Sequence, residues 1–92
     1  MLDAPLPDLI LYGRPGCHLC DEAHAFVTGL LDARQRAGLR TPALVERNIE
    51  SDPGWQRDFF ETIPVVELGD RRIELATSAA RIDRLLSDVL GS

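Results

Sequence analysis

The sequence contains no lysine, and all ten of its basic residues are arginines. Without lysine, no titrating amine of a side chain can take part in the chemistry of this chain. The arginines stay protonated at any relevant pH, so they supply positive charges that do not titrate. Acidic residues outnumber basic ones by 15 to 10, which gives a formal net charge of −5, and no run of like charges forms a tail. Binding to nucleic acid through neutralised phosphates is therefore disfavoured.

Long apolar runs and a basic leader are missing as well. No stretch approaches the roughly 20 apolar residues that a membrane-spanning helix needs. Residues 1–8 contain two acids and no basic residue, whereas a secretory signal starts with a positively charged segment. We therefore expect a cytoplasmic protein that does not bind membranes. The length of 92 residues suits one domain, in which residues 1–7, with two prolines, form a loose lead-in.

Cysteine is scarce too, because the chain has only Cys17 and Cys20. A disulfide between residues three positions apart closes too short a loop to stabilise a fold appreciably. In a reducing compartment such a pair is more often catalytic or metal-binding than structural. A zinc site built from Cys17, Cys20 and His24 would lack the fourth protein ligand of a closed site, so we expect no bound metal. A redox-active thiol pair is the leading interpretation.

Apolar periodicity predicts the order strand, helix, strand, helix, two-stranded hairpin, helix. The predicted strands are 9–12, 43–49, 63–68 and 71–75, and the predicted helices are 17–37, 52–61 and a last helix capped by Thr77 or Ser78. A strand–helix–strand unit places its two strands in parallel, and the hairpin at Gly69-Asp70 adds an antiparallel pair. The predicted fold class is therefore α/β, with a four-stranded mixed sheet and helices on both faces.

Two short motifs strengthen this interpretation. Cys17-His18-Leu19-Cys20 follows the first predicted strand, and Thr62-Ile63-Pro64 precedes the third. Together with the order of elements, they resemble the thioredoxin superfamily, and glutaredoxins in particular. The pattern Tyr12-x-Arg14-Pro15-x-Cys17-x-x-Cys20 is similar to the glutaredoxin active-site segment, and residues 14–23 are similar to a group of small bacterial glutaredoxin-like proteins. The resemblance covers nearly the whole chain and implies a thioredoxin-like fold.

The resemblance implies that Cys17 is the exposed nucleophile and that Cys20 is the resolving cysteine. At a helix N-terminus, Cys17 meets free N–H groups and the positive end of the helix dipole, and both stabilise a thiolate. We expect Arg14 and protonated His18 to lower the pKa of Cys17 further from the free value of about 8.5, against two acids in the first turn. A solvated His18 without a catalytic role is the alternative, and His24 is expected at the surface or its boundary.

Pro64 carries the second half of the expected site. The resemblance implies a cis bond before Pro64 and a position facing the cysteines, which would leave the backbone of Ile63 free to pair with an extended peptide or glutathione. Glutaredoxins usually follow the hairpin with a Gly-Gly pair, whereas this chain has Glu74-Leu75-Ala76-Thr77-Ser78. Glu74 is expected to repel the carboxylates of glutathione, while Thr77 and Ser78 offer an anion site at a helix N-terminus.

The leading functional hypothesis is a thiol–disulfide oxidoreductase that reduces protein or low-molecular-weight disulfides. Its reductant would be glutathione or a thioredoxin-reductase-type system, with glutathione as a co-substrate rather than a bound cofactor. We expect a monomer. Two alternatives stay open at this point: a glutathione-dependent iron–sulfur cluster or metal bound through Cys17, and a thioredoxin-like interaction module whose thiol pair is idle.

Overall fold

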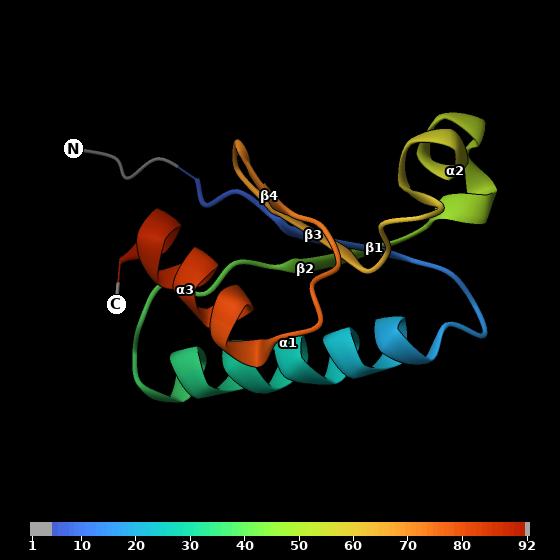
Figure 1. Ribbon diagram of the computed structural model, residues 1–92. Helices are drawn as coiled ribbons and strands as arrows, with labels where there is room; N and C mark the ends of the chain where they lie inside the picture. Colours follow the sequence, from blue (N-terminus) through green and yellow to red (C-terminus); the bar gives the residue numbers. More distant parts are fainter. Residues whose placement is uncertain (1–4, 92) are drawn as a thin grey trace.

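The computed structural model describes residues 5–91 as four strands, three α-helices and one 3₁₀ turn (Figure 1). In chain order the elements are β1 (Leu9–Gly13), α1 (His18–Arg36), β2 (Leu44–Asn48), η1 (Ile49–Ser51), α2 (Pro53–Phe59), β3 (Val65–Leu68), β4 (Arg71–Ile73) and α3 (Ala79–Leu90). This order confirms the predicted one, with η1 as the addition. Within residues 5–91, no helix is long and apolar enough to cross a membrane.

The sheet has the strand order β2-β1-β3-β4. β1 pairs in parallel with β2, so that Leu9 lies opposite Leu44 and Tyr12 opposite Arg47. β3 is antiparallel to both of its neighbours, β1 and β4. The mixed sheet predicted from the sequence is therefore confirmed, and β1 is paired on both sides from Leu9 to Tyr12.

Helices cover the two faces of the sheet unequally. α1 and α3 pack together on one face, while the short α2 lies at one end of the other face (Figure 1). Because side chains alternate along a strand, β1 contributes to two separate cores. Leu9 and Leu11 join the core under α1 and α3, whereas Ile10 and Tyr12 contact the smaller cluster beside α2.

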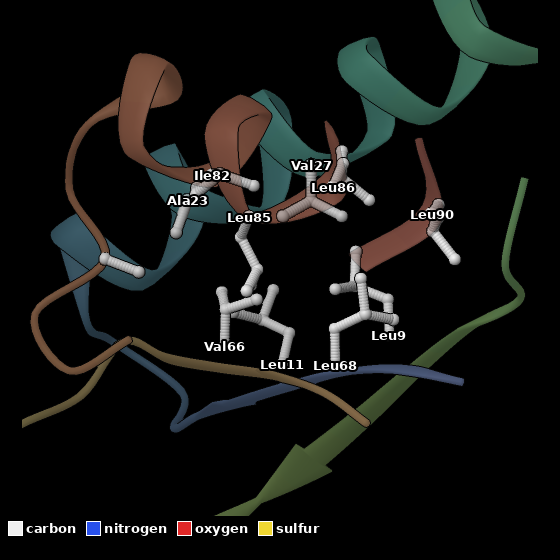
Figure 2. Packing of buried hydrophobic residues seen from close by; sticks show 11 residues of the cluster. Leu9, Leu11, Ala23, Val27, Val66, Leu68, Ile82, Leu85, Leu86 and Leu90 are labelled. Carbon is white, nitrogen blue, oxygen red and sulfur yellow. The ribbon is translucent and has the colours of Figure 1, made fainter. Parts of the chain in front are cut away.

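The larger core is built from aliphatic side chains of the sheet and of two helices (Figure 2). The main contributors are Leu9, Leu11, Val66 and Leu68 from the sheet, Ala23 and Val27 from α1, and Ile82, Leu85, Leu86 and Leu90 from α3. Burial of each of the larger side chains stabilises the fold by roughly 1.5–3 kcal/mol. This core fixes α1 against β1 and so determines how the first turn of the helix lies over the strand.

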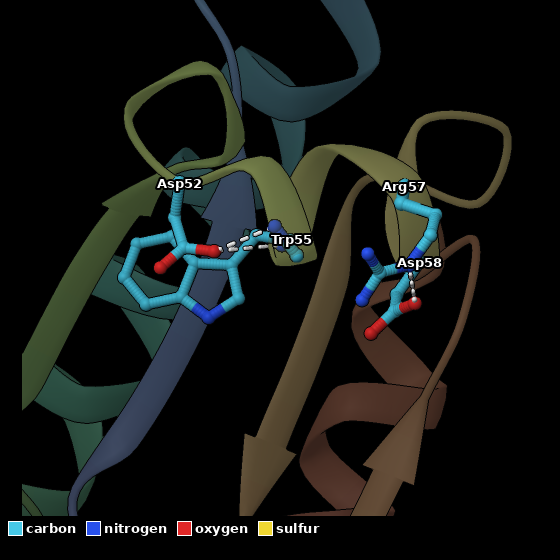
Figure 3. A network of polar contacts seen from close by, with 5 residues as sticks. Asp52, Trp55, Arg57 and Asp58 are labelled. Atoms are coloured by element: carbon cyan, nitrogen blue, oxygen red, sulfur yellow. Dashed lines mark hydrogen bonds and ion pairs between the residues drawn. The ribbon is translucent and has the colours of Figure 1, made fainter.

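Polar caps explain where the elements start. The side chain of Asp52 accepts hydrogen bonds from the backbone N–H groups of Gly54, at 2.8 Å, and Trp55, at 3.1 Å, and so begins α2 (Figure 3). Asn48 does the same for η1, a turn that the sequence analysis did not predict, by accepting from the N–H of Glu50 at 2.9 Å. Ser78 begins α3 by accepting from the N–H of Arg81 at 3.3 Å.

The predicted lead-in, residues 1–7, lies only partly within the described residues, since 1–4 are outside them. Residues 5–8 have no regular secondary structure. Leu6 is nevertheless half-buried and packs against the larger core. This part of the lead-in therefore contributes to the fold.

One buried arginine joins two segments at the end of the molecule that is remote from the cysteines. Arg34, near the end of α1, is 6% exposed. Its Nε–H donates to the carbonyl of Arg40 at 2.9 Å, and its Nη2 donates to the carbonyl of Gly91, just after α3, at 2.7 Å. The guanidinium thus links the C-terminal ends of α1 and α3.

Replacing Arg34 by methionine should lower the free energy of unfolding by about 2–4 kcal/mol, because two carbonyls lose a charged donor. Arg36→Met is the matched control on the same helix, since Arg36 is exposed and pairs with Asp32 at 2.9 Å. An exposed pair of this kind contributes at most about 0.5 kcal/mol. Urea unfolding of the two variants checks the difference, and equal costs would contradict a structural role for Arg34.

Candidate functional site

The two cysteines lie at the start of α1, just after the loop that joins this helix to β1. Gly16, with φ of 77°, turns the loop into the helix, and Cys17 is the N-cap residue with extended backbone. The N–H of Cys20 points at the Sγ of Cys17 over 3.2 Å. The sulfur of Cys17 therefore sits at the positive end of the helix and faces a backbone donor, an arrangement that stabilises a thiolate.

Cys17 and Cys20 are joined by a disulfide, with their Cα atoms 5.2 Å apart. Cys17 is half-buried, whereas Cys20 is only 7% exposed. Cys20 belongs to the apolar cluster that contains Tyr12 and Ile63, and Cys17 packs against the edge of that cluster. Of the two sulfur-bearing residues, Cys17 is the one that an incoming molecule can reach more easily.

Gly13 makes the position of Cys20 possible. A Cβ atom added at Gly13 would lie 3.1 Å from the Cβ of Cys20 and 3.2 Å from its Sγ. These distances are shorter than ordinary van der Waals contact, so the first turn of α1 can approach β1 this closely only because residue 13 has no side chain.

The two residues predicted to tune the thiolate are placed differently. Arg14 is exposed in the loop before Cys17 and lines a cavity beside Cys20. The side chain of His18 is 86% exposed, and its Nε2 lies 3.0 Å from a carboxylate oxygen of Glu22, one turn further along α1. The imidazole of His18 therefore contacts Glu22 and is otherwise in solvent, which agrees with the alternative of a solvated His18.

Ile63 and Pro64 lie beside the cysteines, since Ile63 shares the apolar cluster of Cys20. The Ile63–Pro64 peptide bond is cis, and both residues are buried. The expectation that the backbone of Ile63 is free was wrong in one respect. Its N–H donates to the carbonyl of Phe59 at 3.1 Å, because the chain closes the end of α2 there. The N–H of Ile63 is therefore not available to pair with an extended ligand.

Thr77 and Ser78 are occupied by the start of α3. Ser78 caps the helix through its hydroxyl, and the N–H of Thr77 donates to the carbonyl of Leu75 at 2.8 Å. The guanidinium of Arg81 reaches back to the carbonyls of Leu75, at 3.1 Å, and Glu74, at 3.3 Å. Arg81 thus adds a positive charge that the sequence analysis did not include in this part of the site.

A cavity of about 510 Å³ opens on the other side of Cys20, between α1 and the edge strand β2. Cys20, His24 and Glu46 are among the residues that line it. The Nε2 of His24 lies 3.5 Å from Oε1 of Glu46. The side chain of His24 is 44% exposed, which agrees with the expected position at the surface or its boundary. Its place one helical turn after Cys20 was a signal that the two could face the same space.

A polar network crosses the sheet on the face that carries α2. The buried phenol of Tyr12 accepts a hydrogen bond from Nη1 of Arg47 at 3.0 Å and donates one to Oε1 of Glu67 at 3.2 Å. The guanidinium of Arg47 also stacks over Trp55, 5.0 Å from the ring centroid. Burial raises the pKa of Tyr12, and the opposing effect of the Arg47 hydrogen bond does not cancel it.

Potential metal ligands do not gather in the described part of the chain. Among residues 5–91, no group of three or more histidine, cysteine, aspartate or glutamate side chains is arranged to hold a metal ion. Cys17, Cys20 and His24, the three zinc ligands considered from the sequence, therefore form no such group.

Comparisons with known proteins agree with this geometry. The model of a family described as Glutaredoxin-like domain (DUF836) matches residues 8–90. The solved structure of the structural-genomics target protein XcR50 from X. campestris is 24% identical, with a TM-score of 0.66 over 87% of this chain and 96% of that one. Protein Ne2328 from Nitrosomonas europaea is 22% identical, with a TM-score of 0.55 over 80% of each chain. At these identities the two structures show the fold alone. No curated protein is similar enough in sequence to count as a relative.

The chain has one tyrosine, so the ionisation of Tyr12 can be followed by ultraviolet absorbance. We expect a midpoint above the ordinary value of 10.0, because burial favours the neutral phenol. A raised pKa in the folded state means that this stabilisation is complete below pH 10 and is lost as the pH rises through the folded-state value. Arg47→Met should move the midpoint further up. A midpoint at or below 10.0 in the folded protein would contradict this account.

Gly13→Ala should lower the free energy of unfolding by about 1–3 kcal/mol, the usual cost of overpacking. The matched control is Gly29→Ala in the interior of α1, where an added Cβ meets nothing within 4 Å. That control should gain up to about 1 kcal/mol, because alanine is the better helix former. Denaturant unfolding of both oxidised proteins measures the difference, and a neutral Gly13→Ala would show that the contact with Cys20 is not tight.

Proposed function

The chain belongs to the glutaredoxin-like domain family, and on that premise we propose that it is a thiol–disulfide oxidoreductase with Cys17 as nucleophile and Cys20 as resolving cysteine. The observation that carries the proposal is the disulfide at the start of α1. It joins an accessible N-cap sulfur to a buried one, which is the asymmetry that a dithiol reaction of this kind needs.

The reaction begins with the reduced pair. The thiolate of Cys17 attacks one sulfur of a substrate disulfide, forms a mixed disulfide and releases the first substrate thiol. Cys20 then attacks the Sγ of Cys17, which forms the intramolecular disulfide and releases the second thiol. The substrate gains two electrons and the protein loses two. A thiol reductant, either glutathione or the donor of a thioredoxin-reductase-type system, restores the dithiol.

The N-cap position supports the role given to Cys17. The backbone N–H of Cys20, 3.2 Å from the Sγ of Cys17, and the helix dipole both favour the charged form of that sulfur. The exposed guanidinium of Arg14 in the preceding loop adds a positive charge nearby. A stabilised thiolate is both the attacking group in the first step and the better leaving group when the disulfide is reduced.

The surface around Pro64 is the proposed docking edge for the substrate. Ile63 and Pro64 offer an apolar contact beside the cysteines. Thr77 and Ser78, together with Arg81, offer hydroxyl groups and a positive charge for a carboxylate of the substrate or of glutathione. The exposed side chain of Glu74 opposes such an anion, so the balance between Arg81 and Glu74 decides how well glutathione is held.

The test uses Cys20→Ser. With the resolving thiol removed, the mixed disulfide formed by Cys17 cannot be released internally, so incubation with oxidised glutathione or a disulfide-bonded protein should give a stable adduct, which mass spectrometry detects. Cys17→Ser is the matched control and should form little adduct, because Cys20 is buried. An adduct that forms equally fast on both variants would overturn the assignment of roles, and no adduct on either would overturn the proposed activity.

A further inference from the structure

The cavity between α1 and β2 brings together three groups, of which the proposed function uses only Cys20. His24 follows Cys20 by one helical turn and lines the same cavity. Side chains of a helix lean toward its N-terminus, so the imidazole of His24 leans toward the turn that carries Cys20. From β2, Glu46 approaches the far nitrogen of the ring, with 3.5 Å between its Oε1 and the Nε2 of His24.

Cys20 has a chemical need that this arrangement meets. It must lose its thiol proton before it can attack the mixed disulfide, yet it is 7% exposed and packs in an apolar cluster. Burial disfavours a thiolate. Cys17 has the N-cap position and the N–H of Cys20 to stabilise its charge, whereas the N–H of Cys20 is directed at the sulfur of Cys17 and not at the sulfur of Cys20 itself.

We propose that His24 is the general base for Cys20 and that Glu46 orients it. The inference rests on the proposed function, because it concerns the resolving step. Neutral His24 takes the proton of the Cys20 thiol through a water molecule in the cavity, and Glu46 stabilises the imidazolium that forms. The Cys20 thiolate attacks the Sγ of Cys17, the bond between Cys17 and the substrate sulfur breaks, and the substrate thiolate leaves. His24 then returns its proton to solvent.

Fixed charges around the cavity do not replace such a base. Arg14 from the loop is the positive group that faces it, because the guanidinium of Arg47, which also lines it, is held against Tyr12 and Trp55 on the other face of the sheet. Asp21 from α1 and Glu46 from β2 are the negative groups of the lining. These charges do not favour a buried Cys20 thiolate. The arrangement of nucleophile, base and orienting carboxylate matches the logic by which enzymes activate thiols and hydroxyls.

The two steps can be timed separately with a dithiobis(nitrobenzoate) disulfide, whose thiolate product is yellow. Mixed with the reduced protein in a stopped-flow instrument, it releases one thiolate when Cys17 attacks and a second when Cys20 resolves the adduct. His24→Gln should leave the first phase unchanged and slow the second by roughly ten- to a hundredfold near neutral pH. The gap should close at alkaline pH, where Cys20 ionises without help, a trend that a merely structural defect would not produce.

His18→Gln is the matched control, because it removes the other histidine of α1, which pairs with Glu22 instead. This variant should keep the second phase at the wild-type rate. Glu46→Gln tests the orienting carboxylate, whose side chain is 61% exposed and can be changed without disturbing the fold. If Glu46 orients His24, the second phase slows. If it acts only as a negative charge, its removal favours the Cys20 thiolate and the second phase speeds up.

The outcomes separate the two proposals. If the wild-type protein releases no first thiolate, the proposed function fails and this inference fails with it. If the first phase is present and His24→Gln resolves as fast as wild type at every pH, the base is not His24 and the proposed function still stands. An equal slowing in His18→Gln would also overturn the inference. If His24→Gln does not fold, the sign of the Glu46→Gln effect decides.

Discussion

The arrangement of the site depends on the contact between Cys20 and the backbone of Gly13. Because no side chain stands at the end of β1, the first turn of α1 can lie against the strand, with Cys20 directly over Gly13. This buries Cys20 and leaves Cys17, about one turn earlier, at the N-cap. The different accessibility of the two cysteines, on which the proposed chemistry rests, therefore follows from the packing of one cysteine against one glycine.

The disulfide separates two unlike environments, and the alternation of side chains along β1 produces them. Tyr12 points into the apolar cluster beside α2, where Ile63 and Cys20 also pack. Leu11 and Gly13 face the cavity between α1 and β2, which is lined by charged and titratable groups. An apolar edge suits the docking of a substrate disulfide, whereas a polar cavity suits the movement of a proton. The two proposals thus assign different steps to different sides of one disulfide.

Much of the fold and the position of the cysteine pair could be predicted, because their causes are local in the sequence. The apolar run of β1, the spacing of Cys17 and Cys20, and the capping by Asp52 and Ser78 each depend on residues within a few positions of one another. The contacts that were missed join elements that are distant in the chain. The pairing of His24 with Glu46 requires the register of β2 against α1.

The bond from the N–H of Ile63 to Phe59 was missed for another reason. It depends on how the chain closes the last turn of α2 before Pro64. A motif identifies which residues flank the cysteines, but it does not say where their backbone groups bond. The resemblance therefore placed Ile63 beside the cysteines, as the structure does, but it did not anticipate that the N–H of Ile63 is already bonded.

In the segment before α3, hydrogen bonds hold a backbone conformation that is unusual for a residue with a side chain. Leu75 has φ of 49°, a conformation that glycine adopts without strain and that costs other residues roughly 1–2 kcal/mol. The cost is offset by hydrogen bonds from the N–H groups of Leu75 and Ala76 to the carbonyls of Thr62 and Pro64, at 2.8 and 2.7 Å. Arg81 adds two more bonds to this segment. These contacts hold the backbone of the segment and leave the side chains of Glu74 and Leu75 exposed.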